Sequence, residues 1–366
     1  MVKILLIWTE YLKHVATIRD FVNSFTLYSK NEIDTICIWK LAGVGNCKKV
    51  NINLNNYDYI IFNYTIMHNM ALELSRKNTI LCNTYKSILN NKTKKIFIIQ
   101  DEYYDTGKIN EIIKTYNIDI IFTLLTEEGS KIIYPFPKIK IHNYLAGYIS
   151  EDNNTKNKIK IKDREMDVFY RGRPLNYWYG RLGQDKKNIG IKMKFFCDKY
   201  NIKNDISILE EDRIYGKEWE KRLSNSKVTL ATESGSHIFH FDDSIIKKSD
   251  KLEFDLKYSY KEAIKELNLK EVDYYKNHIS PKMFEAIVYK TALIMFEGYY
   301  NDILHPNIHF IELKRDFSNI DEVLKKIKDD CFLQNMVDRT YKEIVESEKY
   351  SYKSFIKKFD NLLCIN

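Results

Sequence analysis

The stretch 279–298, ISPKMFEAIVYKTALIMFEG, predicts a short helix that leads directly into a buried strand. Ser280 is a favoured N-cap residue and Pro281 suits the first helical position, so the helix over 281–290 has a well-defined start. Residues 292–296 are all apolar, which is typical of a parallel strand covered on both faces. A helix joined to such a strand is the repeating unit of an α/β fold.

The same alternation runs through most of the chain. Helical patterns separate apolar runs that predict strands at 2–8, 32–39, 57–64, 94–100, 118–125, 166–172, 205–209, 227–233 and 309–313. Continuous apolar strands between helices predict parallel sheets with helices on both faces. We therefore expect an α/β protein with two Rossmann-like, doubly wound domains that face each other across a cleft.

Length and composition fit this two-domain organisation. A chain of 366 residues is too long for one ordinary core, and the polar stretch 150–160 has the character of a linker. We expect an N-terminal domain over 1–150 and a C-terminal domain over 151–340. The last segment, 341–366, is predicted to be a helix that crosses back to the N-terminal domain.

The bulk properties narrow the range of partners. A net charge of +8 favours anionic ligands, but no compact stripe of Lys and Arg with interleaved aromatics is present, so we expect no nucleic-acid partner. The six Cys are far apart and the His residues form no metal-binding spacing, so we expect reduced thiols and no metal. The apolar start is too short for a signal peptide, and no run approaches the ~18 residues of a membrane span. These features predict a cytoplasmic protein.

The helix start at Ser280 is the first candidate ligand site. Its free N–H groups and its dipole favour an anion. Lys282 and Glu285 share one helix face, and a cation near the positive end of the dipole suits contact with a phosphate. The Glu285 carboxylate can accept hydrogen bonds from a ribose diol. The alternative is a solvent-facing Lys282–Glu285 pair, and the spacing alone does not separate the two interpretations.

Two further strand-to-helix turns carry candidates for the same site. After strand 227–233, small residues allow a ligand to approach the backbone closely, although a turn without a ligand is the simpler interpretation; the candidates are Glu233, Ser234 and Gly235. The first strand-to-helix turn of the second domain is rich in cationic side chains that could bind a diphosphate. The alternative is that these side chains simply face solvent. The candidates are Arg173, Arg181 and Lys186.

The first domain offers acidic and polar candidates at its strand ends. Asp101 and Glu102 follow strand 94–100. Paired acids at a strand end are suited to general-base catalysis or to binding of sugar hydroxyls. The alternative is that they are only the polar start of a loop. The first strand-to-helix turn carries Thr9, Glu10 and His14. This turn has no G-x-G-x-x-G, which counts against an NAD-dependent dehydrogenase.

With these motifs in place, the chain resembles the GT-B glycosyltransferases, and among them the retaining family 4, or "group 1". The segment SPKMFEAIVYKTALIMFEG is similar to the family's helix and strand in which a glutamate before Ala holds the ribose, a role that would fall to Glu285. YGRLGQDKKNIG is similar to the turn whose Arg and Lys bind the donor diphosphate, which would assign Arg181 and Lys186; VFYRGRP fits as well and would assign Arg173. The family's second glutamate, eight positions before Glu285, is replaced by Asn277.

The resemblance implies a glycosyltransferase that moves a sugar from a nucleotide-sugar donor to a glycan or lipid-linked acceptor in bacterial surface polysaccharide synthesis. It implies retention of configuration, no metal and no cofactor, and it leaves room for peripheral contact with the inner membrane face. Asp101 and Glu102 would be the catalytic candidates, and Thr9, Glu10 and His14 would lie on the acceptor side. Two alternatives remain: an inverting enzyme with Asp101 or Glu102 as base, and an inactive nucleotide-sugar-binding protein.

Overall fold

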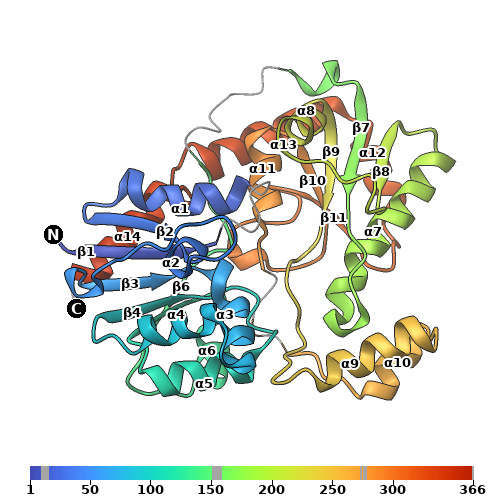
Figure 1. Cartoon of the computed structure of the whole chain (residues 1–366). Coiled ribbons are helices and arrows are strands. Elements are labelled where there is room, and N and C mark those ends of the chain that lie inside the picture. The colour runs from blue at the N-terminus through green and yellow to red at the C-terminus, as the bar shows by residue number, and fades with distance from the viewer. Residues whose placement is uncertain (10–15, 151–158, 273, 275–277, 365–366) are drawn as a thin grey trace.

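The computed structural model describes residues 1–9, 16–150, 159–272, 274 and 278–364 (Figure 1). Two parallel sheets confirm the predicted α/β architecture. The first sheet has the order β2-β1-β3-β4-β5-β6, with strands Lys3–Trp8 (β1), Glu32–Cys37 (β2), Tyr59–Phe62 (β3), Lys94–Ile98 (β4), Ile120–Thr123 (β5) and Lys140–Asn143 (β6). The second has the order β11-β10-β9-β7-β8, with strands Met166–Arg171 (β7), Asn204–Ser207 (β8), Ser226–Ala231 (β9), Ala292–Phe296 (β10) and Ile311–Leu313 (β11).

The helices pack around these sheets and complete two lobes, here called the N-terminal and C-terminal domains. Those of the N-terminal part are Ala16–Tyr28 (α1), Ile38–Ala42 (α2), Tyr64–Arg76 (α3), Ile80–Leu89 (α4), Thr106–Tyr116 (α5) and Glu127–Ile133 (α6). Those that follow are Gly180–Lys199 (α7), Gly216–Ser224 (α8), Ser244–Asp250 (α9), Tyr260–Leu267 (α10), Pro281–Val288 (α11), Ile320–Ile327 (α12), Asp330–Thr340 (α13) and Tyr352–Cys364 (α14).

The strands form where the sequence is apolar without interruption. Four consecutive residues of β1, Ile4 to Ile7, are completely buried, and all five residues of β10 are buried. Strands of this kind need cover on both faces, which the helices provide. Strand β6 was not predicted because its sequence, KIHN, is polar; it forms at the edge of the sheet, where its side chains remain partly exposed.

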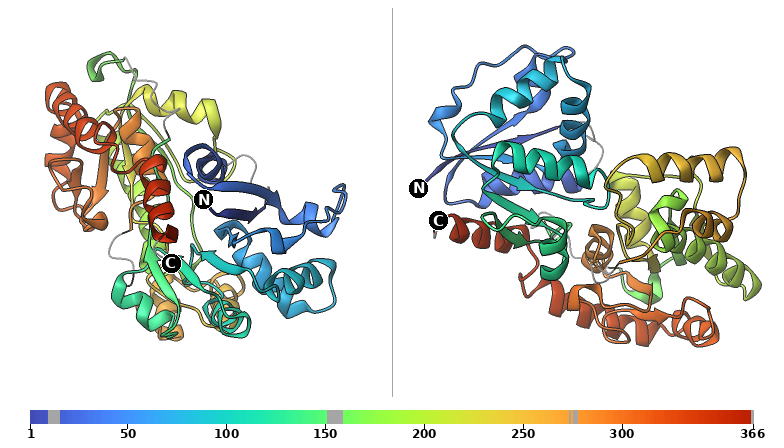
Figure 2. Two further views of the ribbon diagram at one scale, coloured as in Figure 1. Left: turned by 90° about the vertical axis from the view of Figure 1, so that its left-hand side faces the viewer. Right: turned by 90° about the horizontal axis from the view of Figure 1, so that it is seen from below.

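The last helix, α14, lies on the N-terminal domain rather than on the lobe that precedes it. Phe355 and Phe359 pack against Phe25 in the N-terminal core. Asp360, which is 2% exposed, accepts hydrogen bonds from Ser29 Oγ and the Lys30 amide at 2.8 and 2.7 Å. The two chain ends consequently lie close together on this domain (Figure 2).

In the second sheet the connections reverse direction between β7 and β9. The chain passes from β7 outward to β8, then crosses back to β9 and continues to β10 and β11 on the other side. Helices that leave two adjacent strands in opposite directions open a crevice at the carboxyl ends of those strands, where α/β proteins bind their ligands. Residues after β7 and after β9 both line the main cavity.

Candidate functional site

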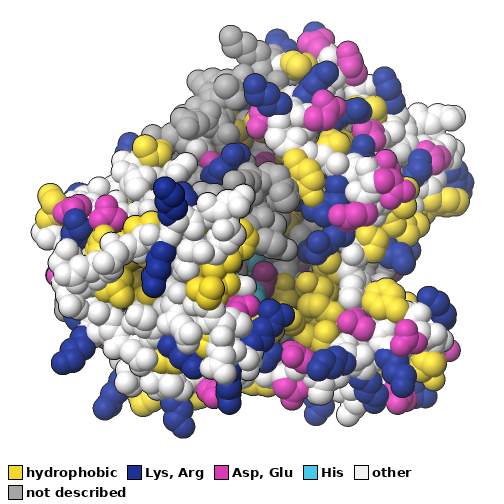
Figure 3. Space-filling model, in the orientation of Figure 1, with side chains coloured by type: hydrophobic (Ala, Val, Ile, Leu, Met, Phe, Trp, Pro, Cys, Tyr) yellow, Lys and Arg dark blue, Asp and Glu magenta, His cyan; other side chains and the backbone are white. Residues whose placement is uncertain are grey.

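A cavity of about 580 Å³ lies between the carboxyl ends of the two sheets. In the space-filling view the hollow opens between the two lobes (Figure 3). Most of its wall comes from the C-terminal domain, from the segments after β7, β8 and β9 and from the start of α11. The N-terminal domain contributes Thr17 and Asp20 of α1 and the turn after β4 with Asp101 and Tyr103. The cavity is thus formed by strand-to-helix turns of both sheets.

Three cationic side chains line this cavity without an acidic partner. Among the described residues, no carboxylate oxygen forms an ion pair with Arg173, Lys186 or Lys282, whereas Arg171 is paired with Asp205 at 2.7 Å. Burial, together with the nearby charges of Lys282 and Arg173, lowers the pKa of Lys186 to about 8. The pKa of Lys282 is also lowered, mainly because protein surrounds it although its side chain remains open to the cavity. Unpaired cations that repel one another in a cavity are suited to bind an anion.

Helix α11 directs its first turn at the same cavity. Ser280 occupies the N-cap position without a side-chain cap hydrogen bond, and Pro281 follows as the first helical residue. Both residues line the cavity together with Lys282. The first N–H groups of a helix and its dipole attract anions, so α11 and the cations act in the same direction.

Glu285 lies one turn further along α11 and also lines the cavity. Its Oε2 accepts a hydrogen bond from Trp219 Nε1 at 2.8 Å, and the Lys282 ammonium sits 5.2 Å from the centre of the Trp219 ring. Burial raises the pKa of Glu285. Trp219 of α8 therefore fixes the carboxylate in place, and among the described residues no donor reaches its other oxygen, Oε1.

Small residues after β9 complete the C-terminal wall. Ser234 and Gly235 line the cavity, and Gly235 has a φ of +88°, a conformation that residues with a Cβ rarely adopt. The Ser234 amide donates to His278 O at 3.3 Å, which ties this turn to the segment just before α11. Backbone can thus approach a ligand closely at this point.

Asp101 faces the cavity from the opposite domain. It is exposed, has a φ of +57°, and its Oδ1 accepts a hydrogen bond from the Tyr103 hydroxyl at 2.8 Å. Tyr103 in turn packs against Tyr179 of the C-terminal domain with ring centroids 5.7 Å apart. The turn after β4 therefore presents one carboxylate to the cations across the cleft.

Several predicted site residues do not line the cavity. Glu102 is 1% exposed, and its Oε1 accepts hydrogen bonds from Thr123 Oγ1 and the Leu124 amide at 2.5 and 3.0 Å, which is a structural role within the N-terminal domain. Thr9 is also buried and outside the cavity wall. Glu10, His14 and Asn277 lie outside the described residues.

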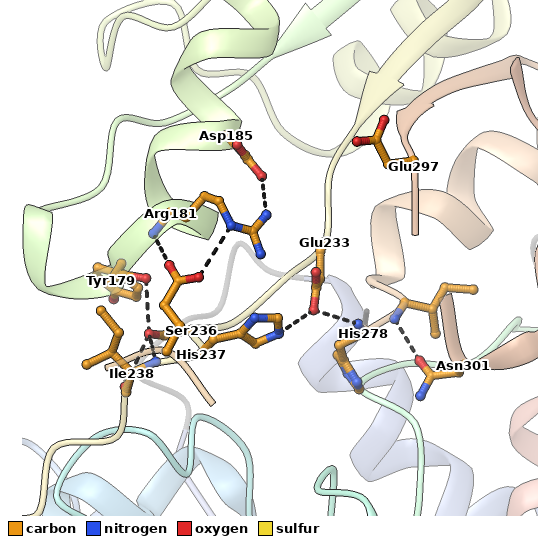
Figure 4. Close-up of polar contacts among 12 residues, drawn as sticks. Tyr179, Arg181, Asp185, Glu233, Ser236, His237, Ile238, His278, Glu297 and Asn301 are labelled. Carbon is orange, nitrogen blue, oxygen red and sulfur yellow. Dashed lines mark hydrogen bonds and ion pairs between the residues drawn. The ribbon is translucent and has the colours of Figure 1, made fainter. Parts of the chain in front are cut away.

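Arg181 and Glu233 are held in polar contacts behind the cavity wall (Figure 4). Arg181 donates from its amide and its Nε to the Glu271 carboxylate at 2.9 and 3.4 Å, and it also contacts Asp185. Glu233 is 2% exposed and contacts His237 Nε2 at 2.8 Å. These contacts occupy the Arg181 guanidinium and the buried Glu233 carboxylate, and neither side chain lines the cavity.

The sequence did not single out Trp219 or Asp20, both of which line the cavity. Each lies on a helix whose pattern only indicates an amphipathic surface, so their approach to the site depends on how the domains pack. The described residues contain no group of three or more potential metal ligands. No helix of the described chain is long and apolar enough to cross a membrane.

No family model matches the sequence, and no curated protein matches it. Solved structures do resemble the fold over essentially the whole chain. An alpha-glucosyltransferase in complex with UDP-glucose and DNA containing an abasic site aligns with a TM-score of 0.58 at 12% identity, covering 100% of both chains. Anabaena HepE in complex with UDP aligns with a TM-score of 0.53 at 7% identity, covering 100% of both chains.

A DNA-modifying beta-glucosyltransferase aligns with a TM-score of 0.51 at 12% identity, covering 97% of this chain and 98% of that one. The chain has the GT-B fold. At these identities the likeness concerns the fold alone, and within the GT-B fold the 580 Å³ cavity lies in the cleft between the two domains.

Proposed function

We propose that this GT-B protein transfers a sugar from a nucleotide-sugar donor to an acceptor. The observation that carries the proposal is the group of unpaired cations, Arg173, Lys186 and Lys282, beside the N-terminus of α11. A nucleoside diphosphate supplies the two phosphates that such a group can bind. UDP-glucose is the ligand named for three solved structures with this fold, those of the alpha-glucosyltransferase, of HepE and of the beta-glucosyltransferase, which supports the choice of donor class.

In this proposal the donor lies along the C-terminal wall. Arg173, Lys186 and Lys282 bind the diphosphate and stabilise it as it departs, because fixed charges in a partly enclosed site favour developing negative charge. The Oε1 atom of Glu285 accepts from a ribose hydroxyl, while Trp219 holds Oε2. The backbone at Gly235 passes close to the transferred sugar or the phosphates. Neither Arg181 nor Glu233 contacts the donor in this arrangement.

Asp101 is the candidate catalytic residue on the acceptor side, together with Asp20 as a neighbouring carboxylate of the cavity. We propose transfer with retention and without a metal, on the basis of the family resemblance. An inverting enzyme with Asp101 or Glu102 as general base is the alternative, and the burial of Glu102 favours Asp101. Activity that survives both Asp101→Asn and Glu102→Gln would exclude the inverting mechanism.

The proposed acceptor is a glycan or a lipid-linked saccharide, as in bacterial surface polysaccharide synthesis, with the protein in the cytoplasm or at the inner membrane face. DNA is the second acceptor class to test. The net charge of +8 favours a polyanion, and two solved structures with this fold are described with DNA or as a DNA-modifying enzyme.

The test is a thermal-shift screen with UDP, GDP, ADP and TDP, followed by mass spectrometry of glycan, lipid-linked and DNA acceptors incubated with the matching nucleotide sugar. A ligand that binds the native state raises the melting temperature. We expect one nucleoside diphosphate to raise it and its sugar to appear on one acceptor class. If no nucleotide stabilises the protein, the donor site is wrong; if one binds and no sugar moves, the inactive binding protein is the better interpretation.

A further inference from the structure

After β9 the chain makes a long excursion, of which residues 236–272 and 274 are described, before it meets the second sheet again at His278. The return is marked by the hydrogen bonds of the Ser234 amide to His278 O and of the His278 amide to Glu233 Oε1, both at 3.3 Å. Between departure and return the excursion contains α9 and α10. It reaches the N-terminal domain at the starts of α5 and α6 (Figure 1).

The excursion pairs with the N-terminal domain through backbone hydrogen bonds. The His240 amide donates to Tyr103 O at 2.8 Å, the Thr106 amide donates to His240 O at 3.3 Å, and the Gly107 amide donates to Phe241 O at 3.2 Å. These bonds run in both directions, as between neighbouring strands. A second attachment lies at the far end of the excursion, where the Thr126 amide donates to Tyr274 O at 2.6 Å.

Side chains and close packing reinforce both attachments. Lys108 forms an ion pair with Asp243 at 3.1 Å. A Cβ on Gly107 would lie 2.3 Å from Phe241 O, and a Cβ on Gly129 would lie 2.8 Å from the Tyr274 Cβ, so only glycine fits at these two contacts. Close contacts of this kind at both ends hold the excursion firmly against the N-terminal domain.

The first attachment lies directly behind the turn that faces the donor cavity. His240 binds the backbone of Tyr103, and the Tyr103 hydroxyl binds Asp101. We propose that the described part of this excursion, attached at His240, Phe241 and Tyr274, is an interdomain clasp that holds the cleft at one width and positions Asp101 opposite the cations of the C-terminal wall. The role of Asp101 rests on the proposed function, whereas the clasp itself rests on the contacts alone.

A clasp limits motion because the domains are also joined on the opposite side. There the Ile149 amide donates to Tyr350 O at 2.9 Å and the Tyr352 amide donates to Ile149 O at 3.1 Å, next to α14. Two connections on opposite sides of a cleft restrict the hinge opening that is common in two-domain proteins. We therefore expect one narrow range of interdomain distances, with or without nucleotide.

Two native cysteines, one in each domain, allow the interdomain distance to be measured directly. Cys47 of the N-terminal domain is half-buried and Cys331 of the C-terminal domain is exposed, whereas Cys37, Cys82 and Cys197 are buried. In a Cys364→Ser background, spin labels on Cys47 and Cys331 report the interdomain distance by double electron–electron resonance. The test variant is Gly107→Ala, whose methyl group displaces Phe241, and the control is Glu111→Ala on the exposed side of the same helix.

We expect one narrow distance distribution for the wild type and Glu111→Ala, unchanged by 1 mM UDP. Gly107→Ala should at least double the width of this distribution and accelerate amide hydrogen exchange at residues 101–107 tenfold or more. Its UDP affinity, measured by calorimetry, should stay within twofold of the wild type.

A wild-type distance distribution that is broad, or that shifts when UDP is added, would overturn the clasp even if Gly107→Ala does not fold. Unchanged width in a folded Gly107→Ala would also overturn it. A narrow distribution in a protein that binds none of UDP, GDP, ADP and TDP would retain the clasp and reject the proposed function.

Discussion

At the scale of single residues, Lys186 is the most informative cation of the cavity. Its pKa of about 8 lies below the usual lysine value of 10.5, so the side chain loses its charge as the pH rises through about 8. UDP affinity should therefore fall as the pH rises through this value. In the complex the pKa of Lys186 should be higher than in the free protein, because the bound anion favours the protonated ammonium. Calorimetric titrations between pH 6.5 and 9.5 measure this dependence.

Replacing Lys186 by Met should weaken UDP roughly 10- to 100-fold, which corresponds to the ~1.5–3 kcal/mol of a hydrogen bond to a charged group. The variant should also lose the pH step near 8. Lys187→Met is the matched control, because Lys187 is adjacent on α7 and does not line the cavity. Equal affinities for UDP in the two variants would remove Lys186 from the diphosphate site.

Glu285 allows the ribose contact to be separated from the phosphate contacts. Glu285→Ala should lower UDP affinity about tenfold, because it removes a charged acceptor from the sugar hydroxyls. Inorganic pyrophosphate, which has no ribose, should bind the variant and the wild type within twofold of each other. A parallel loss of both ligands would mean that Glu285 acts through Trp219 or Lys282 and not on the ribose.

Several of the turns predicted from the sequence line the cavity, but the sequence does not indicate which side chain of a pair reaches it. Asp101 and Glu102 are neighbours, and the φ of +57° at Asp101 directs one carboxylate into the cleft while the other is buried against Thr123. A sequence pattern contains no information on such a backbone reversal. Likewise, Arg181 and Lys186 are both near the start of α7, but Arg181 is paired with Glu271 of the excursion and with Asp185, whereas Lys186 lines the cavity.

At the scale of elements, strands with continuous apolar sequence were predictable because burial on both faces dictates their composition. The edge strand β6 and the excursion after β9 were not, since their positions depend on contacts with distant parts of the chain. The excursion also brings together residues that are far apart in the sequence. The strand end with Glu233, more than fifty residues before Glu285, is the one bonded to the segment that enters α11.

Helix α14 provides a stability test at this scale. Asp360→Ala should lower the free energy of unfolding by about 1–3 kcal/mol, because it removes the buried carboxylate that accepts hydrogen bonds from Ser29, Lys30 and Asn31. Urea unfolding followed by fluorescence measures the change. Lys358→Ala, at an exposed position of the same helix, should differ from the wild type by less than about 0.5 kcal/mol. A similarly small effect of Asp360→Ala would show that α14 is not anchored through this carboxylate.

At the scale of the whole molecule, two sheets, a clasp and α14 form one cleft whose two sides differ in charge. The C-terminal wall contributes Arg173, Lys186 and Lys282, and the N-terminal wall contributes Asp20 and Asp101. Because of this difference in charge, we assign the anionic donor to the C-terminal domain and the acceptor to the N-terminal domain. It arises only when the domains face each other, so no single segment of sequence displays it.

The central claim, that the cavity binds a nucleotide sugar, is tested most directly by calorimetric titration of UDP and of uridine. Both ligands are titrated into the wild type and into a triple variant that carries Arg173→Ala, Lys186→Met and Lys282→Met. If UDP produces no heat, the same titration is made with GDP, ADP and TDP. We expect one nucleoside diphosphate to bind in a 1:1 ratio, at least tenfold tighter than its nucleoside, and to lose that advantage in a folded triple variant. Binding of none of the four, or equal binding of diphosphate and nucleoside, would contradict the assignment of the cavity as a nucleotide-sugar site.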